Sequence, residues 1–139
     1  MKALFIGGTG TISMAISKLL LQKGWELYLL NRGNRNIPEL KGAKFITVDV
    51  NDEAAVSKAI EGLHFDVVGE FIGFVPSQLE RDYRLFKGKC NQFIYISSAS
   101  AYQKPLSNVV VSEKTPLANP YWEYSRNKIA CEDYLMKLY

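Results

Sequence analysis

Residues Lys2 to Leu20 read KALFIGGTGTISMAISKLL, and this stretch decides the fold. It opens with Ala3 to Ile6, an apolar run without polar alternation, which is typical of a strand buried on both faces of a parallel sheet. The run stops at Gly7-Gly8-Thr9-Gly10, and apolar residues then recur at helical spacing from Ile12 to Leu20. The sequence therefore predicts a strand, a glycine turn and a helix at the start of the chain.

The glycine turn matches the dinucleotide-binding fingerprint at Gly8, Gly10 and Ser13, whose third place takes a small residue. Glycine suits this chemistry because a pyrophosphate must come close to the backbone, and free N–H groups at the helix start then donate to it. The alternative is a tight turn that binds nothing. The residues expected to contact a cofactor here are Gly7, Thr9, Gly10, Thr11 and Ile12.

Length, charge and composition exclude several classes of protein. The chain of 139 residues has room for one domain with a real core, which we expect to be a nucleotide-binding domain over 1–139. The net charge of +3 is too weak and too scattered to imply a nucleic-acid partner, and the single His64 argues against a zinc site. Cys90 and Cys131 form no CxxC pair. The immediate start of the first strand and the absence of a long apolar run favour a cytoplasmic protein without a signal peptide or membrane span.

Further strands and helices alternate along the rest of the chain. Strands are expected at 26–30, 44–48, from 66 and at 92–96, and helices at 55–60, 76–86 and from 120 onward, with Asn51 or Asp52 capping the first of these and Asn119 the last. This alternation predicts an α/β fold, a Rossmann-like doubly wound parallel sheet of strand order 3-2-1-4-5. Ligands of such sheets bind beyond the carboxyl ends of the strands.

The end of the second strand bears on the choice of cofactor. An acidic residue commonly binds the adenosine ribose there, but this chain has Asn31 followed by Arg32. Without a carboxylate a 2′-phosphate is not repelled, and Arg32 or Arg35 could pair with it, so NADP is favoured over NAD. Alternatively, both arginines are solvated loop residues. Asp49, after the third strand, could bind the adenine amino group or cap the next helix.

A second group of residues, Ser98, Tyr124 and Lys128, could carry acid–base chemistry. Tyr124 and Lys128 are spaced i, i+4 and so share one face of the last helix. An ammonium favours the phenolate form of a nearby tyrosine, which can then exchange a proton with a substrate hydroxyl. Ser98 follows the fifth strand and could hold the same substrate oxygen. Taken alone, such a tyrosine–lysine pair more often marks a packed ring beside a surface lysine.

With these features together, the chain resembles the short-chain dehydrogenase/reductase superfamily, in particular its extended and atypical branch of NAD-dependent epimerase/dehydratase-like proteins. The resemblance covers nearly the whole chain and rests on GGTGTIS at 7–13, VDV at 48–50, YISSASAY at 95–102, EKTPL at 113–117 and YSRNK at 124–128. It implies Ser98 as the catalytic serine, Tyr124 as the acid/base and Lys128 as its helper. It also implies cofactor contacts from Asn31, Arg32, Asp49, Val50, Phe71, Ile72, Tyr124 and Lys128.

Two departures from the family pattern affect these expectations. Glu70 to Phe74 replaces the small, alanine-rich turn that the family places near the cofactor, and the chain ends at Tyr139, where family members continue with a substrate-binding lobe. We expect the N-terminal part of a longer protein rather than a reduced member. Its open sheet edge and apolar helix faces predict self-association.

The expected activity is that of an NAD(P)-dependent oxidoreductase, epimerase or dehydratase. Its small-molecule substrate would carry a secondary alcohol or a carbonyl, and a nucleotide sugar is one candidate. The alternatives are a non-catalytic dinucleotide sensor, an RNA-binding protein on the same scaffold, and a fragment that is inactive by itself. The complete set of Ser98, Tyr124 and Lys128 favours the enzyme.

Overall fold

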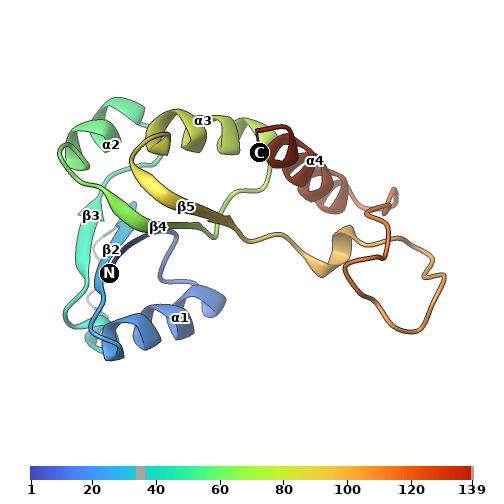
Figure 1. Ribbon diagram of the computed structural model, residues 1–139, viewed down its shortest axis with the longest axis horizontal. Coiled ribbons are helices and arrows are strands. Elements are labelled where there is room, and N and C mark those ends of the chain that lie inside the picture. The colour runs from blue at the N-terminus through green and yellow to red at the C-terminus, as the bar shows by residue number, and fades with distance from the viewer. Residues whose placement is uncertain (34–36, 139) are drawn as a thin grey trace. The chain divides into compact units, whose positions relative to one another are not determined.

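A computed structural model describes residues 1–33 and 37–138 of the chain (Figure 1). These residues divide into two compact units. The first, called the sheet unit, comprises Met1–Ile72 and Arg81–Ile96. The second, called the α4 unit, comprises Gly73–Glu80 and the chain from Ser97 onward.

Strands and helices alternate in the order that the sequence predicts. The elements are β1 (Lys2–Ile6), α1 (Thr11–Gln22), β2 (Glu26–Asn31), η1 (Pro38–Leu40), β3 (Lys44–Thr47), α2 (Glu53–Ala59), β4 (Phe65–Glu70), α3 (Pro76–Phe86), β5 (Cys90–Tyr95), η2 (Ala99–Ala101) and α4 (Glu123–Leu138), where η marks a single 3₁₀ turn. The bounds of α3 are those expected, and the other predicted elements differ by a few residues at their ends.

The strands form one parallel sheet in the order β3-β2-β1-β4-β5, which confirms the predicted topology. In the centre of the sheet, Leu4 of β1 lies between Tyr28 of β2 and Val68 of β4. This order reverses direction between β1 and β4, and such a switch point is where open α/β sheets bind ligands. The expected nucleotide site therefore lies at the carboxyl ends of these strands.

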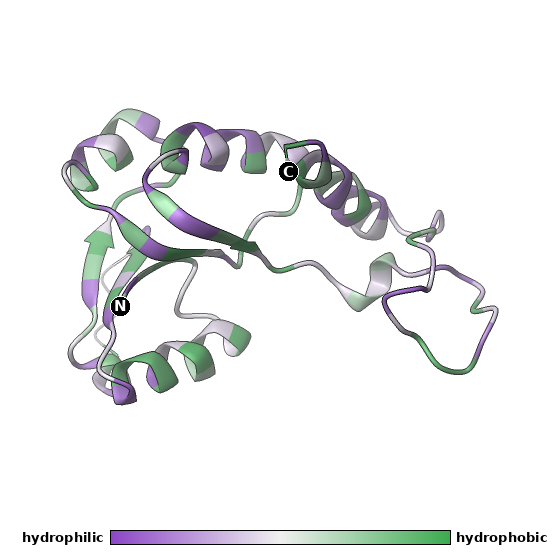
Figure 2. Ribbon diagram, in the orientation of Figure 1, coloured by the Kyte–Doolittle hydropathy of each residue, from purple (hydrophilic) through white to green (hydrophobic). Residues whose placement is uncertain are grey.

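Each face of the sheet carries its own hydrophobic core, because successive strand residues point to opposite sides. Leu4 and Ile6 of β1 pack with Val56 of α2 and Phe86 of α3 on one face. Ala3 and Phe5 belong to the core on the other face, which α1 and η1 cover (Figure 1). Figure 2 shows the strands as largely hydrophobic. Burial on both faces explains why β1 reads as an unbroken apolar run.

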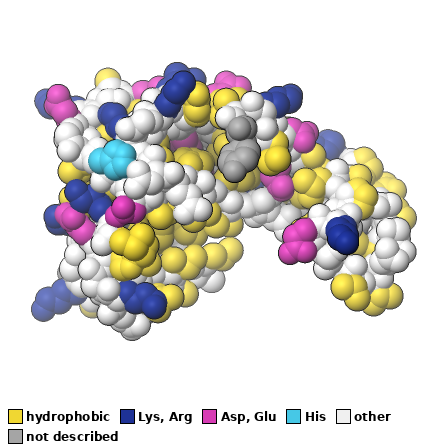
Figure 3. All heavy atoms as spheres, in the orientation of Figure 1, with side chains coloured by type: hydrophobic (Ala, Val, Ile, Leu, Met, Phe, Trp, Pro, Cys, Tyr) yellow, Lys and Arg dark blue, Asp and Glu magenta, His cyan; other side chains and the backbone are white. Residues whose placement is uncertain are grey.

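The predicted first helix is present, but its main apolar stripe does not face the sheet. Ile12 and Leu19 are 64% and 47% exposed, whereas Ser13 and Ser17 are buried. Figure 3 shows hydrophobic side chains on the surface beside α1. Small residues against β1 allow the close helix–strand approach that the glycine turn requires.

Two predictions about helix caps can be compared with the structure. Asp52 is the N-cap of α2, and its carboxylate accepts a 3.0 Å hydrogen bond from the Ala55 N–H. The expectation that Asn119 caps the last helix is wrong, because α4 begins at Glu123. The Asn119 amide instead donates to the Ser100 carbonyl at 2.8 Å and accepts from the Tyr121 N–H, so it closes a turn ahead of the helix.

A search of the described ranges 1–33 and 37–138 for membrane helices and metal clusters gives two findings. No helix there has the length and hydropathy needed to span a membrane. No group of three or more His, Cys, Asp or Glu side chains is placed to hold a metal ion.

Candidate functional site

Glycine is needed at the three positions of the turn after β1 for different physical reasons. Gly7 has φ +79, and a Cβ there would lie 2.4 Å from Cγ2 of Ile72. A Cβ on Gly8 would lie 2.4 Å from a methyl carbon of Leu29. At Gly10 the nearest described atom, the Ser13 Oγ, would be 3.5 Å away. Gly7 and Gly8 are thus required by packing, while Gly10 leaves an open approach to the backbone.

Ser13 and Ser17 hold this turn from the buried side of α1. The Ser13 Oγ accepts from the Gly10 N–H at 2.9 Å and donates to the Gly7 carbonyl at 2.8 Å. One helical turn further, the Ser17 hydroxyl donates to the Gly8 carbonyl at 3.0 Å. Ser13, in the third place of the fingerprint, therefore ties the loop to the helix, a task that glycine cannot perform.

The start of α1 is open to a ligand. Thr11 and Ile12 are exposed and Thr9 is half-buried, and the first-turn N–H groups of a helix lack intrahelical partners. The described part of this turn carries no acidic residue. A helix N-terminus of this kind attracts an anion through its N–H groups and its dipole. The geometry therefore fits the pyrophosphate of a dinucleotide.

The ends of β2 and β3 hold the residues expected to contact the adenosine half. The Asn31 Nδ2 is buried and has no hydrogen-bond partner among residues 1–33 and 37–138, so it is a donor in need of an acceptor. Arg32 is exposed, and Arg35 lies outside the described residues. Asp49 does not cap α2. Its Oδ1 accepts from the backbone and side-chain amides of Asn51 at 2.9 and 3.0 Å.

Val50, Phe71 and Ile72 have different surroundings. Val50 is buried in the core beneath α2, so a ligand could meet its backbone only. The Phe71 ring packs edge-on against Phe5, with centroids 5.0 Å apart, while its N–H donates to the Ile6 carbonyl. Ile72 is 38% exposed and covers Gly7. Of these three, Ile72 presents a side chain beside the glycine turn.

The α4 unit brings Tyr124 and Lys128 together as the i, i+4 spacing predicts. Lys128 is 2% exposed, and its Nζ donates to the Gly73 carbonyl at 2.8 Å. The same Nζ lies 5.8 Å from the centre of the Tyr124 ring and 5.3 Å from that of Phe74. The Tyr124 ring packs against Phe74 and Trp122 at centroid distances of 6.2 and 4.8 Å. The ammonium is thereby fixed beside the phenol.

The serines after β5 have separate hydrogen bonds. The Ser98 Oγ is 2.9 Å from the Ser100 Oγ and accepts from the Ser100 N–H, which caps η2. The Ser97 hydroxyl donates to the Glu132 carboxylate on α4. Among the described residues, the structure records no bond between Ser98 and Tyr124. Ser98 is thus half-buried in the same unit as Tyr124 and Lys128, with its hydroxyl engaged locally.

Comparison with known proteins shows the family to which this chain belongs. The sequence model of the NAD dependent epimerase/dehydratase family matches residues 3–138. The chain belongs to this family. It is 28% identical over 152 residues to the UDP-glucose 4-epimerase of Lactobacillus helveticus, covering 95% of this chain and 45% of that protein.

Two solved epimerases show the same fold as this family member. The UDP-Glc/GlcNAc 4-epimerase of Campylobacter jejuni superposes with a TM-score of 0.83 at 24% identity, over 98% of this chain and 48% of that one. The UDP-glucose 4-epimerase of Bifidobacterium longum, solved with NAD+ and UDP, gives 0.77 at 22% identity, over 99% and 49%. The chain thus spans less than half the length of the curated relatives and solved epimerases.

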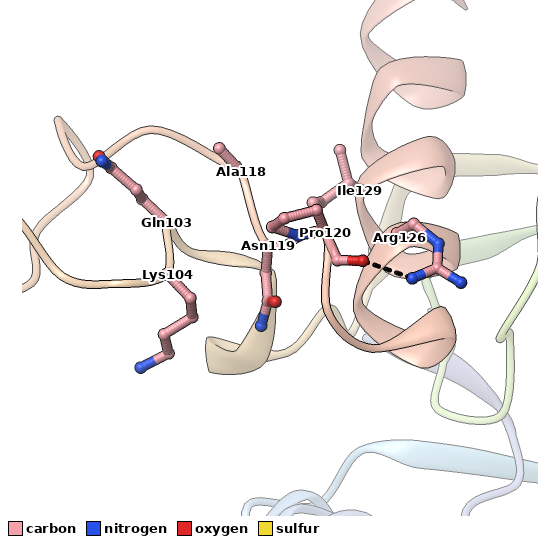
Figure 4. Close-up of a pocket in the computed structure, with 7 residues that line it drawn as sticks. All are labelled: Gln103, Lys104, Ala118, Asn119, Pro120, Arg126 and Ile129. Atoms are coloured by element: carbon pink, nitrogen blue, oxygen red, sulfur yellow. Dashed lines mark hydrogen bonds between the residues drawn. The ribbon is translucent and has the colours of Figure 1, made fainter.

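The epimerase-family chain also has a pocket of about 480 Å³ in its α4 unit (Figure 4). Its lining residues are Gln103, Lys104, Ala118, Asn119, Pro120, Arg126 and Ile129. Arg126 donates to the Pro120 carbonyl at 2.6 Å, so its guanidinium braces the chain entering α4. The pocket does not include Ser98, Tyr124 or Lys128.

Sequence reasoning missed several residues that support the site. Ser17 could have been found from its i, i+4 spacing to Ser13, since both lie on the face toward the glycine turn. Glu132 could have been found because it follows Tyr124 and Lys128 at the same interval of four residues on α4. Gly73 offered no sequence signal, because its carbonyl meets Lys128 through a contact 55 residues apart in the chain.

Proposed function

We propose that this chain binds a nicotinamide dinucleotide and forms the cofactor-binding part of a nucleotide-sugar epimerase-type enzyme. The open backbone at Gly10, at the N-terminus of α1, carries the proposal. The unpaired Asn31 Nδ2 supports it, because the adenosine ribose would supply the acceptor that this buried donor lacks. Membership of the epimerase/dehydratase family and the solved relative with NAD+ agree with this assignment.

The proposed chemistry rests on Tyr124, Lys128 and Ser98. A bound nicotinamide supplies hydride transfer. Tyr124 exchanges a proton with a substrate hydroxyl, and the Lys128 Nζ lies 5.8 Å from the centre of its ring. The Gly73 carbonyl holds that ammonium in place. Ser98 donates to the same substrate oxygen after its hydroxyl turns from Ser100.

We further propose that NADP is preferred over NAD. Asn31 stands where a carboxylate would repel a 2′-phosphate, and the exposed Arg32 follows it. The side-chain amide of Asn31 can donate to a phosphate oxygen as well as to a ribose hydroxyl. The relative crystallised with NAD+ is the reason to test both cofactors.

Calorimetric titration of this chain with NADPH and NADH tests these proposals. Tighter binding of NADPH, lost in Arg32→Ala, supports both the site and the phosphate contact. Tighter binding of NADH supports the dinucleotide site and means that Arg32 is a solvated loop residue without a phosphate contact. Binding of neither cofactor to this chain or to a longer protein that includes it contradicts the proposed function.

We also propose that the chain by itself associates with a second copy. Ile12, Ile16 and Leu19 form an exposed apolar stripe on α1, and Ile94 of β5 is 40% exposed. Contiguous apolar surface of this kind favours association. Sedimentation velocity over a range of protein concentrations measures it directly.

A further inference from the structure

The carboxyl end of β4 holds a buried group of charged side chains that the proposed chemistry does not use. Glu70 of β4 and Asp82 of α3 are both 0% exposed, and Arg81 is 6% exposed. The Glu70 Oε2 and the Asp82 Oδ2 have no hydrogen-bond partner among residues 1–33 and 37–138. Burying a carboxylate oxygen without a donor is costly, so this arrangement requires an explanation.

The single guanidinium in this group is already committed. Arg81 donates through Nε and Nη2 to the Asp82 Oδ1 at 2.9 and 2.8 Å, and through Nη1 to the Asn51 Oδ1 at 2.8 Å. Its Nη2 lies 4.0 Å from the Glu70 Oε2, beyond hydrogen-bond reach. Arg81 therefore neutralises Asp82 and leaves Glu70 without a cation of its own.

Among residues 1–33 and 37–138, no cation other than Arg81 is recorded within ion-pair distance of Glu70. On α2, Glu53 adds negative potential at Asp82, and its own carboxylate is paired with the exposed Arg84. On β5, Tyr95 lies next to Glu70 in register, and on β1 the neighbour in register is Ile6. Two carboxyl groups thus face one guanidinium in a buried site, and one retained proton balances the charge.

The electrostatic surroundings favour a proton on Glu70. Burial, followed by the contact with Asp82, raises the pKa of the Glu70 carboxyl to about 9. Burial also raises the pKa of Asp82, but the neighbouring Glu70 carboxyl and Arg81 oppose that rise. Of the two carboxyl groups, Asp82 has the ion pair with Arg81 and Glu70 has the stronger reason to keep a proton.

We propose that Glu70 keeps its proton at neutral pH and shares it with Asp82 in a hydrogen bond. This shared proton fixes the segment from Glu70 to Ile72, which covers the glycine turn. The Ile72 N–H donates to the Glu70 Oε1 at 2.5 Å. The Ile72 side chain in turn occupies the space where a Cβ on Gly7 would lie. Loss of the proton sets two buried carboxylates against each other and loosens this segment. Glu70 is thus a positioning residue for the dinucleotide site.

The sign of the pH dependence follows from proton linkage. The pKa of Glu70 is higher in the folded chain than its ordinary value of 4.5. Between that value and about 9, the folded state therefore holds about one proton more than the unfolded state. The free energy of unfolding must fall as the pH rises through this window, and Glu70→Gln must remove that part of the fall.

Urea unfolding between pH 5 and pH 9 tests the shared proton on wild type, Glu70→Gln and the exposed control Glu61→Gln. Glutamine can keep both hydrogen bonds of a protonated glutamate. We expect the free energy of unfolding of wild type and of Glu61→Gln to fall equally as the pH rises. For Glu70→Gln the slope against pH should be smaller, by the amount that corresponds to about one bound proton. The difference between wild type and Glu70→Gln isolates Glu70, because these two proteins share every other titratable group. Equal pH slopes in all three overturn the proposal.

The Ile72 amide gives a second readout that a merely structural role would not move. Its ¹⁵N and ¹H shifts in wild type should titrate with one midpoint above pH 7, because its acceptor ionises. An Ile72 amide that does not titrate between pH 6 and pH 10 overturns the proposal even if Glu70→Gln fails to fold.

The link to cofactor binding rests on the proposed function and is measured separately. The dinucleotide affinity of wild type should fall as the pH rises through the midpoint of the Ile72 amide. The affinity of Glu70→Gln should change less over the same pH range. Equal pH dependence in the two proteins contradicts the positioning role. If no dinucleotide binds at any pH, the proposed function fails, and the unfolding and Ile72 measurements still decide whether the proton is shared.

Discussion

The ring and the hydroxyl of Tyr124 have different roles, which a substitution can separate. The ring packs against Phe74 and Trp122, and the Lys128 ammonium lies beside it. Phenylalanine at this position keeps the packing and removes the group that would exchange a proton.

We therefore expect Tyr124→Phe, in an active protein that includes this chain, to lower turnover roughly 10²- to 10⁴-fold and to leave dinucleotide affinity unchanged. Steady-state kinetics and calorimetry measure the two effects. Tyr121→Phe is the control, since Tyr121 is 75% exposed and should keep full activity. Activity of Tyr124→Phe close to that of wild type means that another group is the acid/base.

At individual residues, prediction from the sequence depended on local pattern. The i, i+4 spacing was enough to place Tyr124 beside Lys128, and both meet in the structure. The buried pair of Glu70 and Asp82 could not be foreseen, because it joins a strand to a helix and its effect depends on exclusion from water. The sequence leaves Asp49 two roles, an adenine contact or a helix cap, and its bond to the Asn51 N–H removes the helix cap.

At the scale of elements, the alternation of apolar runs and helical patterns was sufficient for the sheet. Every strand of the predicted order is present. The central strands β1 and β2 are buried on both faces and therefore have a strong apolar signal. The start of α4 was misplaced, because Asn119-Pro120 has the composition of a cap but its side chain bonds to Ser100 and Tyr121. The apolar spacing of α1 does not reveal which of its residues face the glycine turn, because the serines Ser13 and Ser17 are the buried ones.

The N-cap of α2 allows a prediction about one element. Its Asp52 carboxylate accepts from the Ala55 N–H, and helix α2 spans Glu53–Ala59. Removing a capping oxygen typically costs about 1 kcal/mol of stability. Asp52→Ala should therefore lower the free energy of unfolding by about that amount, measured in urea.

Asp52→Asn provides the matched comparison, because its amide oxygen can still cap the helix. It should retain most of the stability that Asp52→Ala loses. Equal losses in the two variants would show that the charge of Asp52, rather than its capping bond, stabilises α2.

At the scale of the whole molecule, the exposed apolar stripe of α1 governs behaviour in solution. Leu19 is 47% exposed on this stripe, beside Ile12 and Ile16. A charge in a self-association surface is costly to bury. We expect Leu19→Lys to shift the chain toward the monomer in sedimentation velocity, by tenfold or more in dimer dissociation constant, which corresponds to about 1.4 kcal/mol.

Ser57→Lys on α2 is the control, since Ser57 is exposed, lies outside this stripe and also receives a lysine. It should associate like wild type. A wild-type chain that stays monomeric at high concentration contradicts the proposed self-association.

The most direct measurement is a calorimetric titration of NADPH and NADH into Gly10→Ala, with Gly8→Ala as its counterpart. Gly10 has φ −81, and a Cβ there meets no described atom closer than 3.5 Å, so Gly10→Ala should fold with wild-type stability. It should bind the dinucleotide at least tenfold more weakly, because the new methyl group fills the space that the pyrophosphate needs. Gly8→Ala should instead be destabilised by about 1–3 kcal/mol, since its Cβ collides with Leu29. Wild-type affinity in a folded Gly10→Ala would show that the dinucleotide does not bind at this turn.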